Sequence, residues 1–231
     1  MNLFYSNFNK SDSDIILDEI DSKHLSKSLR KKGGDTIRIT NGNGLEVRGS
    51  IIRLGKNIKI KILSKVKHQK RTLSIHIAMS ALKNPSRFEW FVEKSTEIGI
   101  SEITPLITKF SEKKKVNISR LNKIVISSMK QSNQFYLPKV NPITSFDEFL
   151  KLNKDYKLIA HLKNNNSFNK KSIGSKDKIV IMIGPEGGFS KEEILKANKE
   201  KIKEISFGKN RFRSETAGVF AVSIINNYKN L

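Results

Sequence analysis

The sequence predicts an α/β protein with two domains, a small all-β domain followed by a larger domain built on a mostly parallel sheet. Two observations lead to this prediction. Between residues 35 and 63, short apolar segments are separated by glycine and asparagine turns, as in a small β-barrel or sandwich. From residue 73 onward, apolar strands alternate with amphipathic helices, which is typical of a parallel sheet covered by helices. The expected domains are 1–68 and 69–231, joined within a basic connector at residues 64–71.

The strands of the first domain are defined by the turns between them. Residues 35–40 alternate apolar and polar side chains, and the Asn-Gly-Asn-Gly stretch at 41–44 supplies residues that tolerate a positive φ. Further strands are expected over 45–54 and 58–63, with Gly55 in the turn between them. The Gly-Asn-Gly piece predicts a hairpin and not a dinucleotide-binding turn, because neither a third glycine nor a helix follows it.

The second domain shows strands and helices in alternation. Strands are expected over residues 73–79, 103–107, 157–161, 178–183 and 204–207. Helices are expected from Pro85 to Gly99, around 121–128, after Ser145, from Ser190 to Lys201, and over 215–228. Three helices are predicted to start with a capping box, in which Glu follows Ser by three residues: Ser86 with Glu89, Ser145 with Glu148, and Ser190 with Glu193. The strands at 157–161 and 178–183 are apolar without alternation, as expected for a sheet covered on both faces.

The charge of the chain indicates a polyanionic partner. Lys and Arg number 44 against 22 Asp and Glu, which gives a net charge of +22. Neutralising phosphates with such side chains releases counterions and strengthens binding, so the excess favours nucleic acid. The alternative is a composition that is rich in Lys and Asn throughout, as the run at residues 163–166 indicates.

The composition also excludes several classes of protein. The chain has no cysteine and 4 scattered histidines, so it offers no disulfide, no thiolate nucleophile and no expected metal site. No run of about 18 apolar residues is present, so no membrane-spanning helix is expected. Residues 1–7 lack the basic start and the apolar core of a signal peptide. The prediction is a cytoplasmic protein without a structural metal.

Two glycine-containing turns, at residues 184–188 and 207–216, follow expected strands of the second domain. Ligands of open α/β sheets bind beyond the carboxyl ends of the strands, and glycines let backbone groups approach a ligand closely. The first turn, Gly-Pro-Glu-Gly-Gly, lacks the Lys of a phosphate-binding loop, and the Rossmann and Gly-x-Ser-x-Gly spacings are absent from the chain. The turns therefore predict a ligand that needs no phosphate-binding loop; the alternative is two tight turns without a ligand.

The two turns, IGPEGGFS at 183–190 and FGKNRFRSETAG at 207–218, resemble the C-terminal signature of the SPOUT methyltransferases. Three further stretches agree in the same order along the chain: HLSKSLRKKGGDTIRITNGNG at 24–44, RFEWFVEKSTEIGISEITPL at 87–106, and SMKQSNQFYLPKV at 128–140. The resemblance is to the branch of the family that methylates N3 of a uridine in the 16S ribosomal RNA of the small subunit. It covers most of the chain and is weakest at residues 150–178.

The resemblance implies a PUA-like, RNA-binding β-barrel at the N-terminus and a C-terminal α/β domain tied in a deep trefoil knot. It further implies a homodimer, S-adenosyl-L-methionine as the methyl donor, and ribosomal RNA of the small ribosomal subunit as the partner. By the same resemblance, the donor would be held by Ile183, Gly184, Glu186, Gly187, Gly188, Phe207, Gly208, Phe212 and Thr216. Ile183, Phe189 and Phe212 would wall the adenine; plain core packing is the alternative for these three.

Methylation of uridine N3 requires that acceptor and donor are aligned, that the N3 proton leaves, and that the developing negative charge is stabilised. Arg213 is the residue expected to be catalytic, since a guanidinium can grip a phosphate or a carbonyl oxygen through two hydrogen bonds. Two roles stay open for Glu215, which could accept the proton or pair with Arg213. Thr216 is expected to cap its helix. His161, at a strand end, is either a titrating group of the site or a satisfied core histidine.

RNA contacts are expected in both domains. The basic cluster of Arg30, Lys31 and Lys32 is the natural phosphate contact of the first domain, and Arg211 offers the same chemistry in the second turn. The alternative for the cluster is a solvated turn, because Lys occurs throughout the chain.

Taken together, the residues and the resemblance predict an enzyme that transfers a methyl group from S-adenosylmethionine to uridine N3 of 16S ribosomal RNA. Two alternatives stay open. The same scaffold could act on another RNA target, such as a tRNA or another ribosomal RNA base, or it could be a non-catalytic RNA-binding protein. The presence of Gly184, Gly188, Arg213 and Glu215 favours the enzyme.

Overall fold

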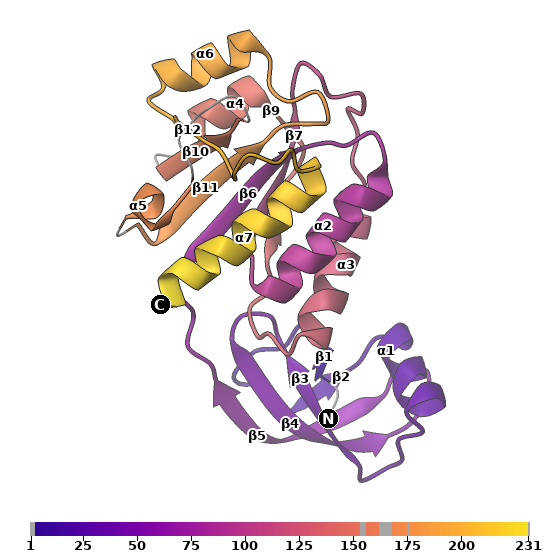
Figure 1. The fold of residues 1–231 in the computed structure, drawn as a ribbon. Helices are drawn as coiled ribbons and strands as arrows, with labels where there is room; N and C mark the ends of the chain where they lie inside the picture. The colour runs from indigo at the N-terminus through magenta and orange to yellow at the C-terminus, as the bar shows by residue number, and fades with distance from the viewer. Residues whose placement is uncertain (1–2, 153–155, 162–167, 175, 231) are drawn as a thin grey trace. The chain divides into compact units, whose positions relative to one another are not determined.

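The computed structural model describes residues 3–152, 156–161, 168–174 and 176–230 (Figure 1). The chain forms two compact units. Unit 1 comprises Met1–Lys70 and Met129–Leu137, and unit 2 comprises Arg71–Ser128 and Pro138–Leu231. Residues 129–137 belong to unit 1 although they follow the first part of unit 2 in the chain, which the sequence pattern did not indicate.

Unit 1 is built on a five-stranded sheet in the order β1-β3-β4-β5-β2. Its elements are β1 (Leu3–Tyr5), β2 (Asp14–Ile16), α1 (Glu19–Lys23), a π-helical turn (His24–Ser28), β3 (Thr36–Thr40), β4 (Leu45–Arg53) and β5 (Lys59–Lys67). β1 pairs with β3 in parallel, and the other pairs are antiparallel. One apolar core, with fully buried Leu25, Ile39, Val47 and Ile60, holds these elements together. The connector expected at 64–71 is partly wrong, because residues 64–67 continue β5 and pair with β4.

The segment 129–137 is fixed to unit 1 by backbone and ring contacts. The Gly44 amide donates to the Phe135 carbonyl over 2.8 Å, and the Leu137 amide donates to the Gly42 carbonyl over 2.8 Å. The Phe135 ring stacks on His68 with 3.6 Å between ring centroids, while the Tyr136 hydroxyl donates to the His68 carbonyl. Gly44 has a φ of 80° and no space for a side chain, because a Cβ there would lie 2.2 Å from the Tyr136 hydroxyl. The turn predicted at 41–44 therefore also packs against residues 135–137, which lie far away in the sequence.

Glu46 lies at the centre of an ionic cluster in unit 1. It accepts hydrogen bonds from Arg38 Nε and bonds His68 Nε2 over 2.7 Å. Burial acts to raise the pKa of the Glu46 carboxyl, but the hydrogen bonds to Arg38 and His68 outweigh it and hold that pKa below its ordinary value. A carboxyl whose pKa is lowered by folding contributes stability above its ordinary pKa and loses it as the pH falls through the lowered value.

Replacing Glu46 with Gln is therefore expected to reduce the acid dependence of stability. Chemical unfolding of the full chain, followed from about pH 6 to about pH 3, measures it. The wild-type free energy of unfolding should fall through this range more steeply than that of the variant, which should be less stable than the wild type at pH 6. Parallel curves would show that the ion pairs of Glu46 contribute nothing.

Unit 2 is built on a sheet in the order β12-β10-β11-β6-β7-β8, with β9 also pairing with β7. The strands are β6 (Ser74–Ser80), β7 (Glu102–Ile107), β8 (Lys139–Val140), β9 (Thr144–Ser145), β10 (Tyr156–Ala160), β11 (Lys178–Ile183) and β12 (Lys203–Ile205). Every pair in it is parallel, as the alternation of strands and helices predicts. The helices are α2 (Pro85–Ile98), α3 (Ile118–Gln131), α4 (Phe146–Lys151), α5 (Lys170–Ile173), α6 (Lys191–Lys199) and α7 (Ser214–Asn230). The last residues of α3, from Met129 on, are counted in unit 1.

Helices cover both faces of this sheet. On one face, α7 packs on β6 and β11 with α2 beside it (Figure 1). On the other, α4 and α6 share a core with Val180 and Met182 of β11. Burial of β11 from both sides explains its continuous apolar sequence. None of the helices in the described part of the chain combines the length and the apolar character that crossing a bilayer needs.

The helix starts predicted from capping boxes are confirmed at α4 and α6 and wrong at α2. The capping boxes at Ser145 with Glu148 and at Ser190 with Glu193 are present, and Gly99 ends α2 with a φ of 101°. The box at Ser86 with Glu89 is wrong, because the N-cap is Asn84, whose side chain accepts from the Ser86 amide. Pro85 then occupies the first helical position, which suits its fixed φ, and Glu89 pairs with Arg120 instead.

Gly218 permits the close packing of α7. A Cβ at this position would lie 2.5 Å from Met79 of β6 and 2.6 Å from Phe91 of α2. Gly218→Ala is expected to destabilise the protein by about 1–3 kcal/mol, the usual cost of overpacking a filled core. Chemical unfolding measures the loss. Gly33→Ala is the control, because a Cβ at Gly33 meets no atom within 4 Å, and an equal loss in both variants would contradict the role given to Gly218.

Candidate functional site

A pocket of about 870 Å³ lies at the carboxyl ends of three adjacent strands of unit 2. Residues at or just after the ends of β10, β11 and β12 line it, namely Ala160 and His161, Ile183 and Gly184, and Ile205 and Ser206. The first residues of α6 and α7 also contribute to its lining, together with Arg87 from the first turn of α2. The pocket is therefore in the place where parallel α/β sheets bind ligands.

The Gly-Pro-Glu-Gly-Gly turn after β11 folds back on itself. The Gly188 amide donates to the Pro185 carbonyl over 2.8 Å, and Gly188 has a φ of 73°. Gly184 faces the far end of the same turn, since a Cβ there would lie 2.9 Å from the Gly188 carbonyl carbon. The first glycine thus permits the close backbone approach, and the last permits the left-handed conformation. At Gly188 an added Cβ would meet no protein atom within 4 Å.

The second turn lies against the first. The Arg211 guanidinium donates to the Glu186 carbonyl over 2.9 Å, and the Ser214 hydroxyl donates to the Gly184 carbonyl over 2.8 Å. Half-buried Phe212 packs with Phe220 of α7 at 5.3 Å between ring centroids. These contacts join two loops that the sequence separates by about twenty residues, so the pocket has walls from both.

Most of the residues predicted for the donor site line this pocket: Ile183, Gly184, Glu186, Gly187, Gly188, Phe207 and Phe212. Phe189, predicted as an adenine wall, lines it too and also packs in the core with Phe146. Gly208 and Thr216 are not among its lining residues. Thr216 is exposed within the first turn of α7, which begins at Ser214, so the prediction that Thr216 caps the helix is wrong.

Of the two residues predicted to be catalytic, Arg213 lines the pocket and Glu215 does not. Arg213 is exposed, and its guanidinium forms no hydrogen bond or ion pair with any residue that the structure describes. Glu215 is only 7% exposed. The alternative in which it pairs with Arg213 is wrong, because its ion pair is with Arg87 Nε at 3.7 Å.

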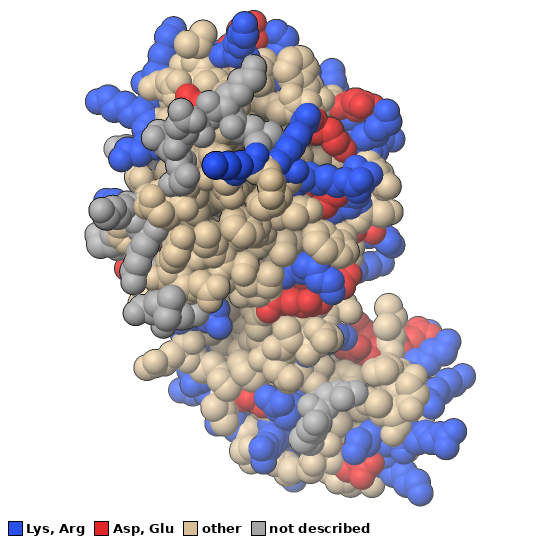
Figure 2. Space-filling model, in the orientation of Figure 1, with Lys and Arg blue, Asp and Glu red and all other residues tan. Residues whose placement is uncertain are grey.

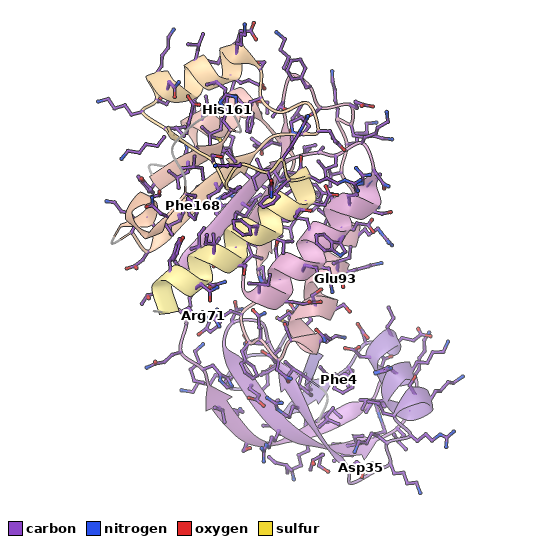
Figure 3. All side chains as sticks on the ribbon, in the orientation of Figure 1. Phe4, Asp35, Arg71, Glu93, His161 and Phe168 are labelled. Carbon is purple, nitrogen blue, oxygen red and sulfur yellow. The ribbon has the colours of Figure 1, made fainter. Side chains whose placement is uncertain are left out.

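Two polar residues of the pocket had no settled role in the sequence analysis: Arg87 was given none, and His161 was left with two alternatives. Arg87 lies in α2 and lines the pocket, and its side chain pairs with Glu215 of α7. His161, labelled in Figure 3, follows β10, and its Nδ1 bonds the Glu204 carboxylate over 2.8 Å. His161 is half-buried and lines the pocket, so it is not a core histidine. The position after a strand was the available signal for His161. The signal for Arg87 was its place at the start of the stretch 87–106, to which no site role was assigned.

The basic cluster predicted to bind RNA lies in unit 1, between the π-helical turn and β3. Arg30 and Lys32 are exposed, and Lys31 pairs weakly with Asp35 at 3.8 Å. Arg30 has a φ of 51°, so the cluster lies in a tight turn. Figure 2 shows Lys and Arg side chains distributed around unit 1 on the visible face and not confined to this turn. Within the described residues, no group of three or more His, Asp and Glu is placed to hold a metal ion.

Comparison with known proteins agrees with this architecture. The family profile described as an RNA methyltransferase domain matches residues 69–226, and the one described as an RNA methyltransferase PUA domain matches residues 17–63. The ribosomal RNA small subunit methyltransferase E of Rickettsia conorii is 34% identical over 202 residues, covering 84% of this chain and 82% of that protein. The protein of the same name from Mesomycoplasma hyopneumoniae is 32% identical over 200 residues, covering 81% and 87%.

A solved structure shows the same likeness. The ribosomal RNA small subunit methyltransferase E of Neisseria gonorrhoeae, bound to S-adenosyl methionine, has a TM-score of 0.85 at 26% identity, covering 98% of this chain and 97% of that chain. An N-terminal PUA domain and a parallel-sheet domain with a pocket at its strand ends are the parts of an RNA methyltransferase. This chain belongs to the family of the ribosomal RNA small subunit methyltransferases E.

Proposed function

We propose that this protein methylates N3 of a uridine in 16S ribosomal RNA of the small ribosomal subunit, with S-adenosylmethionine as the donor. The observation that carries the proposal is the pocket formed by the two glycine turns, with arginines among its lining residues. The family to which the chain belongs supports the reaction and the class of RNA.

The residues of the pocket fit the proposed donor. Adenine needs apolar walls and backbone hydrogen-bonding groups, and Ile183, Phe207 and Phe212 with the two turns offer both. The donor carries no phosphate, so it needs no phosphate-binding loop. When bound, it supplies a methyl group on a positively charged sulfur. We assign its binding to Ile183, Gly184, Glu186, Gly187, Gly188, Phe207 and Phe212, with Gly208 and Thr216 as the less supported members of the set.

Arg213 is the proposed catalytic residue. As the N3 proton leaves, negative charge develops over the imide of the uracil and its two carbonyl oxygens. Because the Arg213 guanidinium has no partner among the described residues, it can donate to such an oxygen without first breaking a bond to one of them, and this preorganisation lowers the barrier. Glu215 is buried against Arg87, which favours a positioning role over that of a proton acceptor.

Further parts of the proposal concern fold and assembly. We propose that the N-terminal sheet closes as a PUA-like barrel and that the C-terminal domain is knotted, with the second turn passing close to the first; the bonds of Arg211 to Glu186 and of Ser214 to Gly184 support the latter. We also propose a homodimer in the cytoplasm. Figure 2 supports this dimer, since few charged side chains lie over α7 on the visible face. The apolar side chains of Val219 and Ile224 in this helix are half-buried.

RNA binding is assigned to the PUA domain and to basic residues of both units. We propose that Arg30, Lys31 and Lys32 bind phosphates, supported by the exposure of Arg30 and Lys32. Arg211 is the proposed contact in unit 2, although its bond to Glu186 already uses one of its donors.

The test uses isotopically labelled S-adenosylmethionine, the purified protein and small ribosomal subunits from cells that lack the enzyme. Nucleoside mass spectrometry of the extracted RNA should show labelled 3-methyluridine. A different labelled nucleoside would contradict the assigned base, and label only in tRNA would contradict the assigned RNA. Donor binding without transfer to any RNA would favour a non-catalytic RNA-binding protein.

A further inference from the structure

Arg87 and Glu215 form an ion pair between the first turns of α2 and α7. Glu215 is 7% exposed, and its carboxylate lies 3.7 Å from Arg87 Nε. A buried carboxylate requires a compensating charge, and Arg87 is the one that the described residues provide. The Arg87 guanidinium is therefore attracted toward α7 by a charge on another helix.

The outer part of the same guanidinium remains available. Arg87 lines the pocket, and no acceptor among the described residues bonds to its terminal nitrogens. The carboxylate approaches Nε, which leaves the two terminal nitrogens free to donate to a second group. Planar recognition of this kind suits a phosphate, which accepts two hydrogen bonds side by side.

The charges around the pocket indicate which ligand this group would bind. Arg87, Arg211, Arg213 and Lys191 line the pocket, and Glu186 is the acidic residue among its described lining residues. The proposed donor carries a net positive charge and no phosphate, so it gains nothing from so many cations. The RNA acceptor is a polyanion, and cations at the pocket strengthen its binding because each phosphate that it brings there needs a counter-charge.

We propose that Arg87 binds a backbone phosphate of the RNA beside the target nucleotide, and that Glu215 is the positioning residue that holds Arg87 for this contact. The inference rests on the proposed function, since it concerns the acceptor of the same reaction. A structural role alone, in which the pair only ties α2 to α7, is the competing explanation.

The test separates the two explanations by the salt dependence of binding. Affinity for small ribosomal subunits is measured by filter binding over a series of salt concentrations, and donor affinity is measured by calorimetry. Arg87→Ala is expected to weaken subunit binding about tenfold and to make the slope of log K against log salt less negative by about 0.7–0.9, the value for one lost phosphate contact. Donor affinity should stay within about twofold, because the proposed donor contacts do not include Arg87.

Arg87→Ala leaves the buried Glu215 without its partner, which could unfold the protein. Further variants therefore test the inference in a folded protein. Arg87→Lys keeps the charge and should keep the wild-type slope, with about threefold weaker binding because the two-pronged geometry is lost. The double variant Arg87→Gln with Glu215→Gln removes both charges, and it should show the same reduction in slope as Arg87→Ala while remaining folded. Glu215→Gln alone should keep the slope but weaken binding several-fold. Arg120→Ala is the matched control, since Arg120 pairs with Glu89 of α2 and does not line the pocket.

An unchanged salt slope in both Arg87→Ala and the double variant would overturn the inference, as would a loss of donor binding equal to the loss of subunit binding. The proposed function is tested separately, by whether the wild type methylates the subunits that it binds. If the wild type binds subunits without methylating them, the proposed reaction fails, whereas the slope still decides whether Arg87 contacts a phosphate.

Discussion

Replacing Arg213 with alanine is expected to lower kcat for methyl transfer by about 100-fold or more, the usual effect of removing one donor that stabilises a developing negative charge. Donor affinity should change by less than about twofold, because the proposed donor contacts do not include this guanidinium. Stability should also be unchanged, since Arg213 is exposed and its guanidinium has no partner in the described part of the chain. Single-turnover transfer to small ribosomal subunits, with calorimetry for the donor, measures both quantities.

Two variants control for charge and for position. Arg213→Lys keeps the charge but loses the two-pronged grip, so it should recover only part of the rate. Lys209→Ala removes a cation from the same turn that is exposed and does not line the pocket, and it should leave kcat within about twofold. A decrease in Lys209→Ala equal to that in Arg213→Ala would show that general positive charge matters and not Arg213 itself. A raised KM with unchanged kcat would make Arg213 a binding residue only.

Local signals in the sequence predicted most of the fold. The pairs Ser145 with Glu148 and Ser190 with Glu193 predicted two helix starts, because a capping box involves neighbouring residues alone. At α2, two starts compete within three residues, and Asn84 before Pro85 forms the cap in place of Ser86. The proline explains the outcome, since the first helical position suits it and the residue before it is held outside the helix.

The sequence pattern could not predict contacts between distant segments. Residues 129–137 join unit 1 through bonds to Gly42 and Gly44, and nothing in either stretch alone specifies the partner. The same holds for the site. The glycine turns could be recognised one at a time by their composition, whereas the pairing of Glu215 with Arg87 depends on how α7 packs beside α2. A role for Arg213 near Glu215 was the natural expectation, because the two are close in sequence.

Gly184 is the position at which a single methyl group is expected to affect the donor most. A Cβ there would lie 2.9 Å from the Gly188 carbonyl carbon and 3.1 Å from the Phe189 amide nitrogen. Both are backbone atoms, so no side-chain rotation relieves the clash and the turn itself must open. Because the Gly184 carbonyl also accepts from Ser214, opening the turn displaces the second loop as well. Overpacking costs about 1–3 kcal/mol, which corresponds to a loss in donor affinity of about 5- to 150-fold when the open turn cannot bind.

Gly187→Ala is the matched comparison within the same turn. Its added Cβ would lie 3.3 Å from the Cβ of Phe110, a contact that a shift of a few tenths of an ångström relieves, whereas the nearest atom to a Cβ at Gly184 lies at 2.9 Å. Donor affinity in this variant should therefore fall by less than about threefold, with calorimetry measuring both variants at the same temperature. Equal losses at 184 and 187 would mean that the donor touches the turn directly at both positions. No loss at 184 would mean that the donor binds elsewhere, since a turn that closes so tightly around Gly184 cannot accept the methyl group unchanged.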